Sequence, residues 1–229
     1  MGRGGDPDAI IKDLGATISG TTYASPITEP LPEISVPTLS YKGTDISTKG
    51  GTVTLTPTDS GTYTEISISK TGVPGVLEIS GGDVELHITG DIELGQSCEI
   101  VIKEGSSLTL YADGDIHCRE NSGMNTESAA KEANKLTIYA TGEDTQYFDI
   151  KAKSEWIGVV YAPNTNVDLY ADGDIYGAVV ANDFELKAGG NFHYDRALKE
   201  VSIEDEGVRL VVNRWSEVKL SDSDLSSSE

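Results

Sequence analysis

The chain has 229 residues, with 17 lysines and arginines against 38 aspartates and glutamates, and its formal net charge is −21. This length suits one domain with a buried core, and this charge disfavours binding to nucleic acid or to an anionic membrane surface. No stretch approaches the roughly 20 consecutive apolar residues that a membrane span requires. Hydrophobic residues make up 37% of the chain, aromatic residues 7%, and 25 residues are glycine. This composition is too apolar for a disordered chain and has few of the large residues of a helical core.

The first 50 residues differ in composition from the rest. Residues 8–14 fit a short helical turn, and the stretch from Gly15 to Ser47 is rich in threonine, serine and proline. Each proline removes a backbone donor and favours an extended conformation in the residue before it. We therefore predict that residues 1–50 form a helical turn followed by an extended strap that lies on the main body.

Short alternations of apolar and polar residues recur through the body of the chain. They occur at residues 52–55, 65–68, 76–79, 84–88, 98–102, 108–111, 136–139, 148–150, 167–170 and 184–186. Such alternation, bounded by Gly, Asp, Asn or Ser, is typical of short half-buried strands. Residues 119–135 interrupt the pattern, and within them residues 128–134 most resemble a helix, so we predict an insertion loop there.

The strands also repeat in sequence. Residues 108–116 (LTLYADGDI) return almost unchanged as residues 167–175 (VDLYADGDI), and glycines 90, 114, 142, 173 and 190 follow related strands. An imperfect repeat of roughly 17 to 30 residues, built from short strands and Gly/Asp turns, is typical of a parallel β-helix. We predict an all-β fold, a right-handed parallel β-helix over residues 51–200. Residues 201–219 are then a capping strand, and residues 220–229 a disordered acidic tail.

A β-helix stacks its inward apolar residues in columns and turns its corners at Gly, Asn and Asp. Tyr111, Tyr139 and Tyr170 hold the same position in the repeat. They form either an aromatic column that packs adjacent coils together, which we favour, or a ladder on which sugar rings stack. Cys98 and Cys118 fall on neighbouring coils, where a disulfide or two stacked free thiols would both fit.

The candidate metal ligands are four aspartates in two Asp-Gly-Asp turns, Asp113, Asp115, Asp172 and Asp174. Carboxylates beside a glycine turn can bind calcium, but the twelve-residue calcium loop and the calcium-binding nonapeptide repeats are absent. Turn chemistry alone explains these residues, so they are weak calcium candidates and we assign no metal site, no cofactor and no catalytic residue.

The histidines suggest no catalytic site. We interpret residues 193–195 (His-Tyr-Asp) as a capping turn, because no serine or cysteine is placed by sequence to join them. His87 and His117 stand alone in strand-like surroundings, where a surface or edge position is the ordinary expectation.

Six segments carry a resemblance to a known family: residues 83–92, 108–116, 158–169 (GVVYAPNTNVDL), 173–181 (GDIYGAVVA), 191–198 (NFHYDRAL) and 215–217 (WSE). Together they resemble the C-terminal β-helical domain, of unknown function, of bacterial pilus-assembly PilX-like and other pilin-like surface proteins. A looser likeness is to bactofilins, cytoskeletal proteins built from a short β-helix. The pilin-like resemblance implies an extracellular or cell-surface domain, anchored in the membrane by an N-terminal hydrophobic helix that this sequence does not include.

We therefore expect a non-enzymatic extracellular structural or adhesive domain of a pilus-like or surface-anchored bacterial protein. Its partners would be other surface or pilus proteins, or glycans, without nucleic acid and without direct membrane contact by this segment. One alternative is a self-assembling bactofilin-like scaffold, which predicts unprotected apolar end coils and leaves the oligomeric state open. Another is a carbohydrate-binding or polysaccharide-cleaving β-helix, which predicts a groove lined by carboxylates or tyrosines.

Overall fold

The computed structural model describes residues 17, 31–43, 45–127, 130–142, 146–151, 156–170, 174–187, 191–195 and 198. Three sheets form the fold. The first contains β1 (Ile46–Lys49), β4 (Ile66–Ser69), β7 (Ile92–Leu94), β10 (Ile116–Cys118) and β13 (Phe148–Ile150), in that order. The second contains β2 (Gly51–Leu55), β5 (Gly75–Ile79), β8 (Glu99–Ile102) and β11 (Gly123–Met124). The third contains β3 (Gly61–Tyr63), β6 (Asp83–Ile88), β9 (Ser107–Ala112), β12 (Leu136–Ala140), β14 (Trp156–Tyr170), β15 (Asp174–Lys187) and β16 (Asn191–Tyr194).

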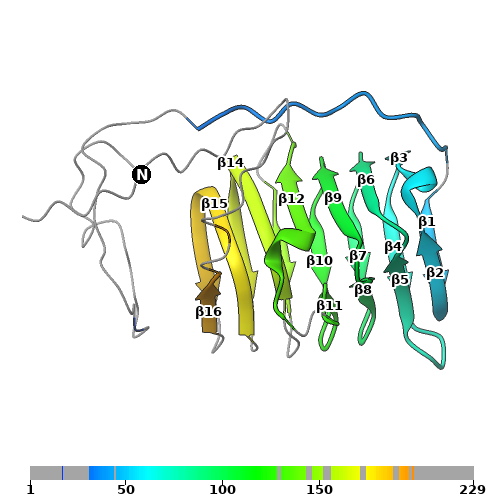
Figure 1. Ribbon diagram of the computed structural model, residues 1–229. Helices are drawn as coiled ribbons and strands as arrows, with labels where there is room; N and C mark the ends of the chain where they lie inside the picture. Colours follow the sequence, from blue (N-terminus) through cyan, green and yellow to red (C-terminus); the bar gives the residue numbers. More distant parts are fainter. Residues whose placement is uncertain are drawn as a thin grey trace, which may run out of the picture.

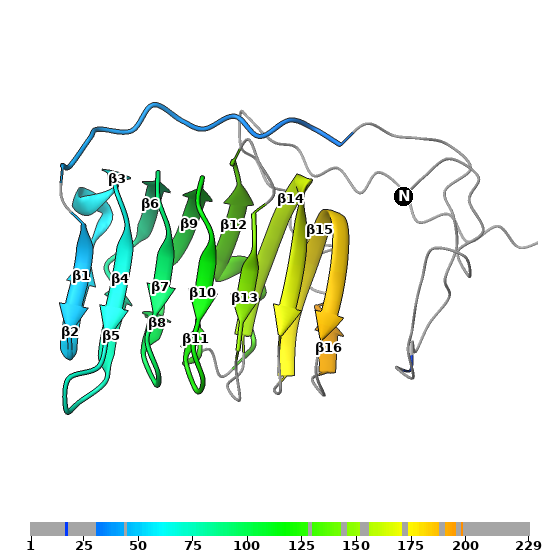
Figure 2. The same cartoon turned by 180° about the vertical axis from the view of Figure 1, so that it is seen from behind.

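Up to β14, successive strands pass from one sheet to another, whereas β14, β15 and β16 are neighbours in the third sheet. Each strand pairs with the strand one coil away. The named strand pairs of all three sheets are parallel. Figure 1 shows the coils stacked in a row, from β1–β3 at one end to β16 at the other, and Figure 2 shows the first sheet from outside. The predicted parallel β-helix is confirmed.

The core consists of stacked apolar columns inside the coils. In the first sheet, one column joins Ile46, Ile66, Ile92, Ile116 and Phe148 in direct register. None of these side chains is more than 4% exposed. Burying each one stabilises the fold by about 1.5–3 kcal/mol, and none can be buried without the coil above or below it.

Glycines turn one corner of the coil, as predicted for the glycines at positions 90, 114 and 142. The N–H of Gly90 donates to the carbonyl of Thr64 at 2.7 Å. A Cβ atom on Gly114 would lie 2.5 Å from the carbonyl carbon and oxygen of Gly90, and one on Gly142 would lie 2.5 Å from the carbonyl oxygen of Asp113. Adjacent coils therefore approach at this corner more closely than a side chain allows.

The long sequence repeat does not mark equivalent positions in the coils. Residues 108–112 of β9 pair with β12, and β12 in turn pairs with residues 159–161 of β14. Val167 lies further along β14, where it pairs with Phe184 of β15, so it is not equivalent to Leu108. Tyr161, not Tyr170, pairs with Tyr139, so the predicted column of three tyrosines is wrong at its third member. The reason is the length of β14, which has 15 residues. The second copy of the repeat begins near its C-terminal end, beyond the residues that pair with β12.

The insertion also begins later than predicted. Residues 123–124 form β11 and pair with β8, so the coil continues through them before the chain leaves it. Ala133–Lys135 form a short 3-10 helix, like Pro57–Asp59 near the N-terminal end, and residues 128 and 129 lie outside the described residues. Within the described ranges, no helix is long and apolar enough to cross a membrane.

An extended segment of the predicted strap, residues 31–43, lies along the outside of the third sheet (Figure 1). Ile34 and Val36 pack on the buried rings of Tyr111, Tyr139 and Tyr161. The predicted helical turn at residues 8–14, the capping strand at 201–219 and the tail at 220–229 lie outside the described residues.

Candidate functional site

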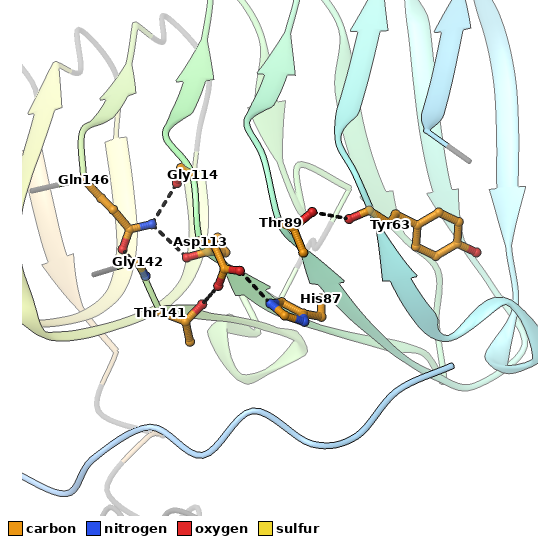
Figure 3. Close-up of polar contacts among 9 residues, drawn as sticks. Tyr63, His87, Thr89, Asp113, Gly114, Thr141, Gly142 and Gln146 are labelled. Carbon is orange, nitrogen blue, oxygen red and sulfur yellow. Dashed lines mark hydrogen bonds and ion pairs between the residues drawn. The ribbon is translucent and has the colours of Figure 1, made fainter. Parts of the chain in front are cut away.

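Asp113, the first calcium candidate, connects three consecutive coils (Figure 3). Its Oδ2 atom lies 2.9 Å from Nε2 of His87 on β6, one coil earlier. Its Oδ1 atom accepts a 2.6 Å hydrogen bond from the Thr141 hydroxyl, one coil later. Both carboxylate oxygens are thus engaged in holding the coils together, and His87 has a defined partner.

Asp115 takes part in a second series of contacts between coils. Its N–H donates to Oδ1 of Asp91 at 2.9 Å, and its own Oδ1 accepts the N–H of Tyr147 at 2.9 Å. Its Oδ2 lies 3.9 Å from Nε2 of His117. Each aspartate of this series satisfies a backbone donor of the following coil, which is the role that turn chemistry predicts.

Gln146 is a buried polar residue of the same corner that the sequence pattern did not indicate. Its Nε2 donates to the carbonyls of Ala112 and Gly114, both at 2.8 Å, and its Oε1 accepts the N–H of Gly142 at 3.0 Å (Figure 3). The side chain is 3% exposed. It hydrogen-bonds to backbone groups of two adjacent coils and so links them, while its own buried polar atoms are satisfied.

Asp174 lies apart from these aspartates. It begins β15, whereas Asp113 and Asp115 follow the end of β9 in the same sheet. The amide of Asn191 donates to its Oδ1 at 2.9 Å and, with His193, holds the pKa of the carboxyl below its usual value. Asp172 lies outside the described residues. Across the described ranges, no group of three or more His, Cys, Asp or Glu is placed to hold a metal ion.

The predicted capping turn at residues 193–195 is partly wrong. His193 and Tyr194 belong to β16, which pairs with β15, and the N–H of Asp195 continues this pairing by donating to the carbonyl of Gly177. Only the carbonyl of Asp195 leaves the sheet pairing, and it accepts the N–H of Leu198. The ring of His193 stacks on Tyr176 with centroids 4.6 Å apart. The side chain of His193 thus has its partners, Tyr176 and Asp174, on the preceding strand, which favours continuation of the sheet over a turn.

A groove of about 580 Å³ opens on the outer side of the first sheet, beside the ends of β7, β10 and β13. Glu93, His117 and Asp149 stand in direct register on these three strands. Parallel strands are about 4.8 Å apart, so this column places an imidazole between two carboxylates. The residues that line the groove are Glu93, Gln96, His117, Cys118, Arg119, Glu120, Asp149 and Lys151.

The groove holds two kinds of polar side chain. Asp149 and Lys151 form an ion pair at 3.1 Å, although Oδ1 of Asp149 is buried without a hydrogen-bond partner in the described part of the chain. Four others are exposed, and within that same part their side chains make no hydrogen bond or ion pair: Glu93, Gln96, Arg119 and Glu120. These four are free to contact a ligand.

Cys118 lies at the base of the groove and is not a nucleophile. Burial raises the pKa of its thiol to about 12, and the nearby Asp149 carboxylate adds to the rise. At neutral pH the thiol therefore stays protonated and unreactive. Both Cys118 and Cys98 are buried and free, but the two residues are not in register, because Cys118 pairs with Leu94 of the preceding coil.

Comparison with known families gives one result. The model of a domain of unknown function (DUF7305) matches residues 11–201, which include every described strand. No curated protein and no solved structure matches the chain significantly.

Proposed function

We propose that this chain, which belongs to the DUF7305 family, is a rigid, non-enzymatic structural and adhesive domain exposed on the outside of a bacterial cell. The proposal rests on one observation, that polar side chains at a corner of the coils form hydrogen bonds to the adjacent coils. Asp113, Asp115 and Gln146 bond to neighbouring coils, so the residues that suggest chemistry serve to stiffen the stack. A stiff stack held together along its whole length suits a domain that carries load or projects a surface.

The strap adds to this rigidity. It runs across the third sheet and contacts tyrosines of three consecutive coils, so a segment that is distant in sequence from these coils ties them together. The net charge of −21 keeps copies of the chain apart at low salt, which favours display of single domains over lateral packing. The finer assignment, to the exposed part of a pilus-like assembly, rests on the pilin-like segments of the sequence.

The location is tested on intact cells of a bacterium that expresses the full-length protein. Externally added protease, or an antibody to the β-helix, should reach the domain while a cytoplasmic marker stays protected. A domain that becomes accessible only after the cells are broken would contradict the proposal.

The assembly state is tested by light scattering of the purified chain over a range of protein and salt concentrations. A monomer throughout supports a displayed domain. Growth into long particles as concentration rises would replace the proposal with the self-assembling scaffold, in which the end coils are the functional surfaces.

A further inference from the structure

We infer that the groove between the ends of β7, β10 and β13 binds a short segment of an uncharged oligosaccharide. This inference deepens the proposed adhesive function, on which it rests, by naming the class of ligand. The described part of the strap packs on the third sheet, whereas the groove opens on the first. Figure 2 shows β7, β10 and β13 facing the viewer, with the described part of the strap along the edge above them.

The free side chains of the groove include both hydrogen-bond donors and acceptors. Glu93 and Glu120 offer carboxylate acceptors, while Gln96 and Arg119 offer amide and guanidinium donors, and Gln96 can also accept. A sugar hydroxyl donates one hydrogen bond and accepts others, so neighbouring hydroxyls of one ring can use both kinds of group. Hydrogen bonds that involve a charged partner are the stronger ones, and three of these four side chains are charged.

The charge of the groove selects against acidic ligands. Lys151 is paired with Asp149, which leaves Arg119 as the unpaired lysine or arginine among the described lining residues. Glu93 and Glu120 outnumber it, and the whole chain carries a charge of −21. Uronates, sulfated sugars and phosphates would be repelled, whereas a neutral saccharide has no such cost.

Two stacked turns fix the backbone that carries three of the four free side chains. Ser97 and Asn121 both have positive φ, 61° and 57°, and each closes a tight corner of its coil. The N–H of Ser97 donates to the carbonyl of Glu120 at 3.1 Å, and the N–H of Ser122 to that of Arg119 at 3.1 Å. The backbone that carries Gln96, Arg119 and Glu120 is therefore organised before a ligand arrives, which lowers the entropic cost of binding.

The size of the groove and its lining set the expected affinity. A volume of about 580 Å³ falls in the range of small-molecule sites, roughly 300–1,000 Å³. None of its described lining residues is a phenylalanine, tyrosine or tryptophan, whose large rings stack best on sugars, so a Kd in the order of 1 mM is expected. Display of many copies on one surface would raise the overall avidity without any new contact.

The test is a nuclear magnetic resonance titration of the full chain with neutral trisaccharides of glucose, mannose, galactose and N-acetylglucosamine. A galacturonate trisaccharide serves as the acidic comparison. We expect saturable shifts at residues 93–96 and 117–120 with at least one neutral sugar. Arg119→Ala and Glu120→Gln should each weaken binding about tenfold, the loss of one charged hydrogen bond.

Two matched variants control for the loss of charge. Lys70→Ala and Glu104→Gln change exposed residues outside the groove and should leave Kd unchanged. The inference is overturned if no neutral sugar binds saturably, if the groove variants bind as the unchanged chain does, or if the acidic trisaccharide binds best. A surface-exposed monomer that binds no sugar would overturn this inference alone. A chain that binds sugar but is inaccessible to external protease on intact cells would overturn the proposed location alone. A chain that binds sugar but grows into long particles would overturn the proposed assembly state alone.

Discussion

The hydroxyl of Tyr161 donates a 2.6 Å hydrogen bond to the carbonyl of Pro32, 129 residues earlier in the chain. Tyr161 itself is fully buried in a column with Tyr139, whose ring it meets edge to face, and Tyr111, beneath the strap. The ring centroids of Tyr111 and Tyr139 are 5.1 Å apart and those of Tyr139 and Tyr161 are 6.1 Å apart. The tyrosines therefore serve the packing role that we favoured over a sugar ladder, and the strap covers them.

The Tyr161→Phe variant should loosen the strap without unfolding the coils. It keeps the aromatic packing but removes the hydrogen bond to Pro32, at a cost of about 1 kcal/mol. Hydrogen exchange of residues 31–40 should accelerate about fivefold, while exchange of the core strands stays nearly unchanged. Tyr147→Phe, at a tyrosine that is 52% exposed, is the matched control and should have no effect on the strap. Equal exchange of the strap in both variants would show that this bond does not anchor it.

Gly114→Ala should destabilise the fold strongly. The new methyl group would lie 2.5 Å from backbone atoms of Gly90, and backbone cannot move aside as a flexible side chain does. We expect a loss of about 3 kcal/mol or more in the free energy of unfolding, measured by urea denaturation.

The control for this variant is Gly72→Ala. Gly72 has φ of +77°, but a Cβ atom there would meet nothing within 4 Å, so the cost is the backbone strain alone, about 1–2 kcal/mol. A Gly114→Ala variant as stable as Gly72→Ala would mean that the coils can separate at this corner.

These glycines show what sequence reasoning can and cannot reach. Gly90, Gly114 and Gly142 could be found from the sequence, because this corner requires a glycine in each coil and the glycine therefore recurs after each related strand. Tyr161 was missed because its partners are set by the register of a 15-residue strand, and local similarity directed attention to Tyr170 instead. Similar short sequence segments indicate similar local turns, but they do not show that the segments occupy equivalent positions in their coils.

The groove could not be predicted from the sequence either, because coil lengths decide which outward residues become neighbours. Period-two alternation places Glu93, His117 and Asp149 on outward positions, but it does not say that the three are neighbours. That depends on the number of residues in each coil, which varies with the loops. The corner turns that carry Arg119 and Glu120 fell within the segment assigned to an insertion.

Asp113→Ala should lower stability by about 1–2 kcal/mol, because it leaves Thr141 and His87 without their common acceptor. Glu65→Ala removes the same charge from an exposed position where the described residues offer the side chain no partner, and it should cost less than about 0.5 kcal/mol. Urea denaturation of the two variants measures the difference. Equal stabilities would mean that the contacts of Asp113 with its neighbouring coils add nothing to the fold.

The two cysteines should resist thiol reagents in the folded protein. Cys98 and Cys118 are at most 2% exposed, and burial raises the pKa of the Cys118 thiol to about 12. A chromogenic disulfide reagent at neutral pH should therefore label neither residue until denaturant is added, and then label both. Rapid labelling under native conditions would show that the groove above Cys118 opens to its base. Reduction before denaturation is the control for a disulfide formed during handling.

Alkaline pH should weaken the fold through its buried phenols. Burial raises the pKa of Tyr161, and burial together with the nearby charge of Asp59 raises that of Tyr63. Below about pH 10, the value for an unfolded chain, both states keep these protons and stability is unaffected. Above it the unfolded state releases them first, so stability falls as pH rises through the folded-state values, by at most about 1.4 kcal/mol per pH unit for each phenol.

The tyrosine contribution is separated from that of the lysines, which titrate in the same range, by a double variant, Tyr63→Phe with Tyr161→Phe. Its stability should be lower near neutral pH, because two hydrogen bonds are lost, to Asp59 and to Pro32. Its stability should then decline less steeply above about pH 10, because two groups no longer ionise. Urea denaturation across this range gives both quantities, with Tyr147→Phe as the exposed control. If the free energy of unfolding of the double variant falls with pH as steeply as that of the unchanged chain, the alkaline loss of stability comes from the lysines and not from the buried phenols.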